Sequence, residues 1–116
     1  MENAEVRWAE MLRALGHPVR LGIMRRLAAR PETCACDFSD VFGLKQPTIS
    51  QHLKVLREAD LVTTRRRGNQ ICYSVHPDAI LELTDTLGAL AARPADATSR
   101  SGRTSGPGAL DRVDRP

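Results

Sequence analysis

The sequence has few of the features that mark secreted, membrane-bound or multidomain proteins. Its 116 residues suffice for one modest hydrophobic core but not for two. No apolar run approaches the roughly 20 residues of a membrane span, and the acidic start lacks the basic-then-apolar order of a signal peptide. We therefore expect one small cytoplasmic domain without membrane contact. In that reducing compartment three cysteines, an odd number, are typical of free thiols, metal ligands or redox sensors rather than structural disulfides.

Net charge is also small, but it is unevenly distributed. A formal charge of +3 at pH 7 does not by itself indicate a nucleic-acid partner. Between residues 45 and 68, however, six basic residues stand against only Glu58 and Asp60. The excess of positive charge is therefore concentrated in one segment.

Apolar residues at helical spacing predict five helices. Pro18 and Pro47 fit first helical turns, where the missing N–H costs nothing, and Gly43 is typical of the left-handed residue that follows a helix. The expected helices cover residues 4–15, 18–30, 36–42, 47–59 and a last segment that begins at residue 77. The third and fourth helices, joined by a tight turn with glycine, form a helix-turn-helix candidate.

The segment LVTTRRRGNQICYSV, residues 61–75, changes to strand-like spacing. Two β-favouring runs flank RGN, which can supply the positive φ angles of a hairpin turn. We therefore expect a mainly α fold with a small β-hairpin, a winged helix-turn-helix. Residues 1–92 would form the DNA-binding and dimerisation domain. Residues 93–116 are rich in Arg, Asp, Ser, Gly and Pro, and we expect them to be a disordered tail.

The fourth predicted helix has a polar face of short side chains. If Ile49, Leu53 and Leu56 point inward, helical geometry places this face outside, where Gln can bond adenine and Thr can meet a thymine methyl. An ordinary solvated helix has similar features, but three arginines at a following hairpin tip favour phosphate or minor-groove contact. His52 lies nearer the core side, so packing is an alternative role for it. The candidate contacts to double-stranded DNA are Gln46, Pro47, Thr48, Ser50, Gln51, His52, Lys54, Arg65, Arg66 and Arg67.

Three segments in order and spacing resemble the ArsR/SmtB family of metal-responsive repressors: ALGHPVRLGIMRRL, LKQPTISQHLKVLREADLV and RRRGNQICYSV. The resemblance covers roughly residues 5–91. It implies a homodimer with its interface on the first and last helices, which agrees with the broad apolar stripe of the last helix, and a palindromic operator as DNA partner. One departure is Asp60, where the family usually has glycine.

The resemblance also implies a metal site at the start of the third helix, because Cys34, Cys36 and Asp37 resemble the Cys-x-Cys-Asp sequence of the family. Soft thiolates favour soft ions, so arsenite or antimonite is the first candidate inducer, with cadmium, lead or zinc as alternatives. The family pattern for arsenic has a third cysteine where this chain has Ser39. We expect Cys72 either to be the third ligand or to be a thiol on the wing without a role.

The spacing of the two cysteines has a physical consequence. Side chains two residues apart on a regular helix differ by about 200°, whereas at an extended helix start they can lie together. Ligation by both cysteines should therefore distort the start of the third helix and move the DNA-reading element. We also expect Ile71, Tyr73 and Val75 to face the core and Cys72 to face the other side of its strand.

Three other functions remain as alternatives. The thiols can form a redox sensor in a DNA-binding protein, with Cys72 or a second subunit as the disulfide partner. A repressor of the same fold can respond to zinc or nickel through its last helix, but Asp78, Glu82 and Asp85 after His76 do not predict a zinc site there. An enzyme such as an arsenate reductase needs an anion loop, and none follows either cysteine. We therefore expect no catalytic residues.

Overall fold

The computed structural model describes residues 3–92, so the predicted tail lies outside the described residues. The described part of the chain divides after Leu83 into two units. The elements are α1 (Asn3–Leu15), α2 (Pro18–Ala29), β1 (Thr33–Cys34), α3 (Ala35–Phe42), α4 (Gln46–Glu58), β2 (Val62–Arg67), β3 (Gln70–Val75) and α5 (Pro77–Ala91). Among the described residues, no helix has the length and hydropathy to span a membrane.

One hydrophobic core joins the helices to the inner face of the sheet. The side chains of Ile49, Leu53 and Leu56 are completely buried, which confirms the predicted inner face of α4. They pack in a cluster with Met11 of α1, Leu27 of α2 and other apolar side chains. Burying these side chains ties the orientation of α4 to the rest of the first unit.

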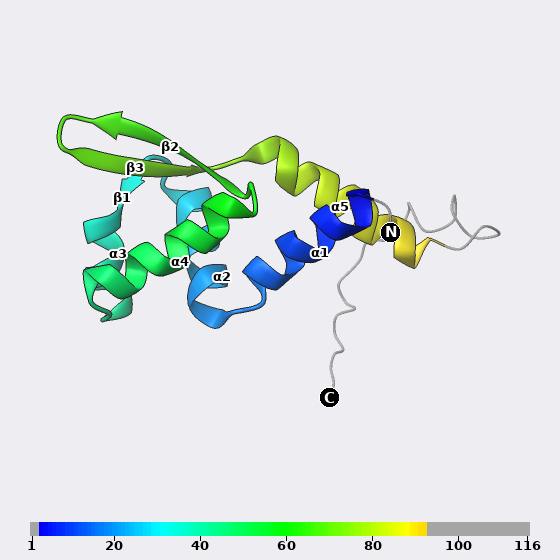
Figure 1. Cartoon of the computed structure of the whole chain (residues 1–116), viewed down its shortest axis with the longest axis horizontal. Helices are drawn as coiled ribbons and strands as arrows, with labels where there is room; N and C mark the ends of the chain where they lie inside the picture. Colours follow the sequence, from blue (N-terminus) through cyan, green and yellow to red (C-terminus); the bar gives the residue numbers. More distant parts are fainter. Residues whose placement is uncertain (1–2, 93–116) are drawn as a thin grey trace. The chain divides into compact units, whose positions relative to one another are not determined.

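The turn between α3 and α4 follows the predicted chemistry. Gly43 has a φ of 66° and ends α3 in the left-handed conformation, and Pro47 lies in the first turn of α4. Gly22 of α2 allows close packing, because a Cβ there would lie 2.8 Å from the ring of Phe42. These contacts set α3 and α4 as a helix-turn-helix beside the sheet (Figure 1).

The sheet has one strand more than the sequence predicted. Its order is β1-β3-β2 and both pairings are antiparallel, with Cys34 opposite Cys72 and Cys72 opposite Arg65. We missed β1 because a strand of two residues has no period of its own and pairs with a strand far along the chain. The helix α3 begins at Ala35, directly after β1 and one residue earlier than expected.

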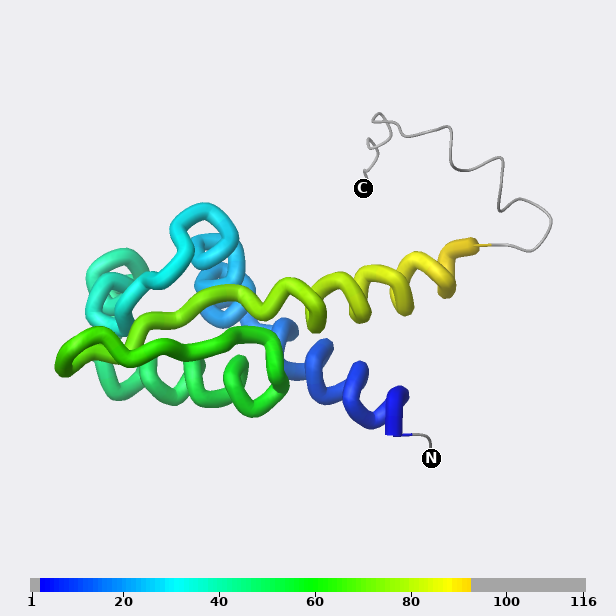
Figure 2. Tube along the Cα trace, turned by 90° about the horizontal axis from the view of Figure 1, so that it is seen from above, coloured from blue at the N-terminus to red at the C-terminus, as the bar shows by residue number. Residues whose placement is uncertain are grey.

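The wing returns along the recognition helix. After the turn at Asp60 the chain reverses, and Figure 2 shows β2 running back alongside α4. Gly68 begins the hairpin turn with a φ of 61°, which confirms its predicted role. Asn69 and Gln70 of the hairpin and Gln46 and Ser50 of α4 line one surface pocket, so the hairpin and the first turns of α4 can meet one DNA duplex.

Candidate nucleic-acid interface and thiol site

The outward face of α4 is polar and accessible. Because the inner face is held by the core, all but one of the predicted contacts on this helix are exposed: Gln46, Pro47, Thr48, Ser50, Gln51 and Lys54. Side chains near the N-terminus of such a helix are the ones that reach base edges in the major groove. The predicted face and the observed face therefore coincide.

His52 is the exception on α4. Its ring centroid lies 4.6 Å from that of His17, and its Nδ1 lies 3.4 Å from a guanidinium nitrogen of Arg20. Burial, followed by electrostatic interaction with His17 and Arg20, lowers the pKa of His52. The Nδ1 of His17 in turn accepts a hydrogen bond from the N–H of Val19 at the start of α2. The structure thus places His52 in packing between α4 and α2.

The three wing arginines lie at the exposed end of β2 and point to alternate faces of the strand. Arg65 donates to Glu32 Oε2 at 2.8 Å and Arg67 donates to Glu32 Oε1 at 2.6 Å. These two arginines lower the pKa of Glu32, and the hydrogen bond from Arg67 is the largest cause. Sequence reasoning missed Glu32, because nothing local relates it to a hairpin more than thirty positions away.

Cys34 and Cys72 come together across β1 and β3. Their sulfurs are 3.1 Å apart, and the Cys34 thiol also donates to Gln70 Oε1 at 3.0 Å. Tyr73 and Val75 pack against the core as predicted, and Cys72 lies on the other face of the strand. The expectation for Ile71 was wrong, because it is 37% exposed where the hairpin extends beyond the core.

The pairing changes the acidity of Cys34. Its hydrogen bond with Cys72, followed by burial, raises the pKa of the Cys34 thiol to about 11. Cys34 is therefore almost entirely protonated at neutral pH. A thiol in this state reacts slowly with oxidants, because the thiolate is the nucleophile.

Cys36 is close to Cys34 in sequence, but its sulfur is not part of the Cys34–Cys72 pair. It is exposed in the first turn of α3, and its sulfur lies 4.0 Å from Asp37 Oδ1. Within residues 3–92, no three His, Cys, Asp or Glu side chains are grouped closely enough to hold a metal ion. A surface pocket of about 460 Å³ nevertheless connects the thiols with the recognition helix and the wing, and its lining is Cys34, Ala35, Cys36, Gln46, Ser50, Asn69, Gln70, Ile71 and Tyr73.

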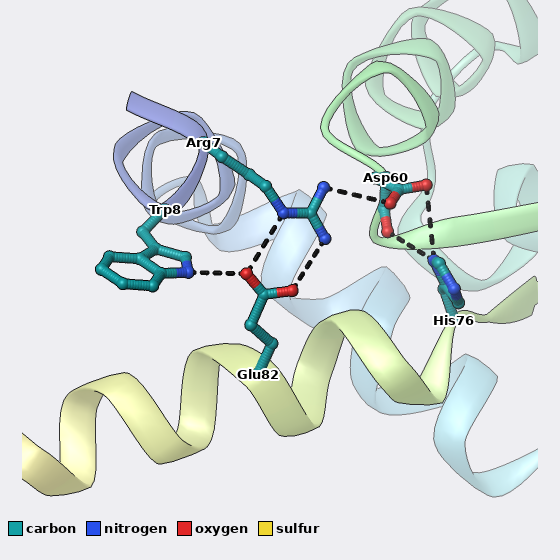
Figure 3. Close-up of polar contacts among 5 residues, drawn as sticks. All are labelled: Arg7, Trp8, Asp60, His76 and Glu82. Atoms are coloured by element: carbon teal, nitrogen blue, oxygen red, sulfur yellow. Dashed lines mark hydrogen bonds and ion pairs between the residues drawn. The ribbon is translucent and has the colours of Figure 1, made fainter. Parts of the chain in front are cut away.

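Asp60, the departure from the family pattern, has a structural explanation. It has a φ of 68°, a left-handed conformation that glycine favours and that aspartate tolerates better than most residues. Its carboxylate lies 3.3 Å from Arg7 and 3.4 Å from His76 (Figure 3). Arg7 also pairs with Glu82, which accepts a hydrogen bond from Trp8. The network ties the end of α4 to α1 and to the first turns of α5.

A short helix pair, an exposed polar recognition helix and a basic hairpin define a winged helix-turn-helix regulator that binds DNA. Comparison with known proteins identifies the family of this regulator. The family model described as bacterial regulatory protein, arsR family, matches residues 17–64. The chain belongs to the ArsR family of transcriptional regulators. Proteins of this family regulate transcription.

The chain is similar to proteins with different names within the family. It is 42% identical to the arsenical resistance operon repressor of Staphylococcus xylosus, over 66% of this chain and 73% of that protein. It is 37% identical to the biofilm growth-associated repressor of Agrobacterium fabrum, over 81% and 80% of the two chains. Among solved structures, HlyU from Vibrio cholerae N16961 matches with a TM-score of 0.61 and 30% identity, over 75% of this chain and 97% of that one.

Proposed function

We propose that the protein is a homodimeric repressor that binds a palindromic operator and releases it when its thiols bind a thiophilic ion. Arsenite or antimonite is the preferred inducer, with cadmium, lead or zinc as alternatives. The observation that carries this proposal is the Cys34–Cys72 pair, whose sulfurs are 3.1 Å apart. Cys34 directly precedes α3, the first helix of the helix-turn-helix. The arsenical resistance repressor among the relatives supports the choice of inducer.

The operator contacts follow from the exposed residues of α4 and the wing. Gln46, Thr48 and Gln51 are suited to base edges, and Ser50, Lys54 and the wing arginines to phosphates. A dimer would place two recognition helices on half-sites about 34 Å, one helical turn, or a multiple of it, apart. Equal affinity for palindromic and scrambled DNA would contradict this proposal.

Exposed apolar side chains support a homodimer. Val6 and Leu12 of α1 are 46% and 43% exposed, and Leu81 of α5 is 59% exposed. In the second unit, Leu87 and Leu90 are exposed as well. Exposed large apolar side chains on both α1 and α5 fit the dimer interface that the family resemblance implies for the first and last helices. A second copy of the chain is the partner that a palindromic operator requires.

The thiols fit a soft ion in part. Two sulfurs on one ion lie at most about 4.6 Å apart, twice a metal–sulfur bond of about 2.3 Å, so Cys34 and Cys72 are close enough to share one. Cys36 must move to complete three sulfur ligands. Because Cys36 lies in the first turn of α3, this movement would unwind the start of the helix-turn-helix. Ion-bound and DNA-bound states would then differ in structure, as derepression requires.

The raised pKa of Cys34 favours a metalloid over a divalent metal. A protonated thiol must lose its proton before it binds a cation such as cadmium. In contrast, a thiol that replaces a hydroxide of arsenite or antimonite transfers its proton to that hydroxide, which leaves as water. The overall metalloid reaction therefore releases water rather than a free proton, so its equilibrium does not depend on pH while the thiol is protonated.

The proposal is tested by fluorescence anisotropy of the reduced protein on DNA from upstream of its own gene. Arsenite, antimonite, cadmium, zinc and nickel are titrated in parallel. We expect release by arsenite or antimonite near stoichiometric levels, and we expect Cys34→Ser to abolish it. Tight DNA binding that none of the ions disturbs would overturn the choice of a metal or metalloid inducer and leave the DNA-binding function in place.

A thiol redox sensor is the second candidate, and the closeness of Cys34 and Cys72 favours it. Peroxide would oxidise the two thiols to one disulfide, and the two electrons and two protons removed would convert the peroxide to two water molecules. The raised pKa of Cys34 works against this reaction. Release by peroxide without any ion, reversed by dithiothreitol and lost in Cys72→Ser, would establish it.

A further inference from the structure

Glu32 occupies an unusual position beside the wing. It has a φ of 59°, a left-handed conformation that is uncommon for glutamate. Its N–H donates to Ser74 Oγ at 3.2 Å, and the neighbouring Thr33 hydroxyl donates to Arg30 O at 2.6 Å. The backbone before β1 is therefore held against β3, and the carboxylate of Glu32 is fixed where the wing arginines reach it.

The carboxylate of Glu32 binds two of the three wing arginines, one with each oxygen. The Glu32 side chain is only 30% exposed, whereas Arg65 and Arg67 are 70% and 60% exposed. Arg66, which points to the other face of β2, forms no ion pair among the described residues. The carboxylate is thus the more buried partner, and the two arginine side chains are the more exposed ones.

We propose that Glu32 competes with DNA phosphates for Arg65 and Arg67, and that it thereby sets the affinity of the wing for DNA. This inference rests on the proposed contact between the wing and the operator. When DNA binds, each arginine exchanges the carboxylate for a phosphate, and Glu32 is left as a negative charge close to the duplex. The operator therefore binds these two arginines less strongly than it would bind an arginine with no internal partner.

The position of Glu32 also relates this competition to the thiols. Glu32 directly precedes β1, two residues before Cys34, and Cys34, Cys72 and Arg65 are opposite one another across the sheet. A displacement of β1 at Cys34 would therefore move the carboxylate relative to the arginines. The competition is a device through which the thiol site can reach the wing as well as α3.

The first test is Glu32→Gln in the full chain, with DNA affinity measured by anisotropy over a range of salt concentrations. Exposed ion pairs are individually weak, so we expect tightening of about three- to tenfold. The salt dependence should become steeper, by up to about 0.9 in the logarithmic slope for each additional phosphate that an arginine neutralises. Glu10→Gln removes the same charge from an ion pair with Arg13 on α1 and serves as the matched control, for which we expect no change at the wing.

A second variant guards against a folding defect. Glu32→Gly removes the carboxylate and fits the left-handed backbone better than glutamine, so it should preserve β1 and also tighten binding. Both variants should lose their effect when Arg65 and Arg67 are replaced by alanine. If Arg65→Ala with Arg67→Ala leaves the affinity unchanged, the wing contact and this inference both fail. If that pair weakens binding but Glu32→Gln does not tighten it, only this inference is overturned.

Discussion

The outward face of α4 and the outer face of the sheet are the two regions that carry the proposed function, and they are built in different ways. The DNA-reading face consists of neighbours along one helix, held in place by Ile49, Leu53 and Leu56 beneath it. The outer face of the sheet brings together Glu32, Cys34, Cys72 and Arg65 from three strands and the residue before them. The reading surface therefore depends on helical period, whereas the sensing surface depends on strand register.

The largest expected effect comes from a substitution in the core, which should disrupt both regions at once. Leu53 lies completely buried under α4, so Leu53→Ala should lower the free energy of unfolding by about 2–5 kcal/mol through lost burial and a cavity. Urea denaturation followed by circular dichroism measures this change. The matched control is Val41→Ala at an exposed position of α3, expected to stay within about 0.5 kcal/mol. Similar losses for both variants would contradict the buried position of Leu53.

The second prediction separates reading from stability. Gln51 is exposed on the outer face of α4, so Gln51→Ala should weaken operator binding by about 1–3 kcal/mol through a lost base contact. Its unfolding midpoint should remain close to that of the wild type. Anisotropy on operator and scrambled DNA measures the difference. A uniform loss on both DNAs would show that Gln51 contacts the backbone rather than a base.

The third prediction separates sensing from reading. Cys72→Ser should reduce the apparent affinity for arsenite at least about tenfold, because it removes one sulfur of the observed pair. Binding to the operator without inducer should be unchanged, since Cys72 is buried in the sheet and is not part of the exposed face of α4. Titration of the protein–DNA complex with arsenite measures both. Full arsenite response in Cys72→Ser would return the site to Cys34 and Cys36 alone.

The fourth prediction concerns pH and distinguishes the inducers. The pKa of Cys34 is raised to about 11, so the thiol is protonated throughout the range from about pH 6.5 to 8.5. Affinity for cadmium should rise with pH, by up to about tenfold per unit for each proton displaced. Affinity for arsenite should change little over the same range, because its hydroxides carry the protons away as water. Parallel titrations at three pH values measure the two slopes, and equal slopes would contradict the assigned protonation of Cys34.

Most of the architecture was predictable because its signals are local. Proline at the first turns of α2 and α4, Gly43 after α3 and Gly68 in the hairpin act within a few residues, and all lie where expected. The comparisons confirm the family that the recognition helix and wing resemble. The domain boundary at residue 92 and the individual site residues stay predictions.

The parts that could not be predicted involve contacts between distant residues. The strand β1 was missed, and with it the position of Glu32 beside the wing. The aspartate at position 60 looked like a departure from a pattern, whereas it pairs with Arg7 and His76 from other elements. Packing and DNA contact were both expected for His52, and only the folded chain shows its ring beside that of His17.

Helical and strand periods are properties of neighbouring residues, so the sequence alone predicts that a basic hairpin follows a polar helix face. The sequence also places two thiols at the start of α3. Which thiols meet is a matter of long-range contacts, since Cys34 and Cys72 are 38 positions apart and are brought together by the register of β1 on β3. The tertiary structure likewise decides that the arginines of the wing have an internal carboxylate partner. The pairing of β1 with β3 joins distant parts of the chain, so, unlike the register of the β2–β3 hairpin, it is not fixed by a local turn.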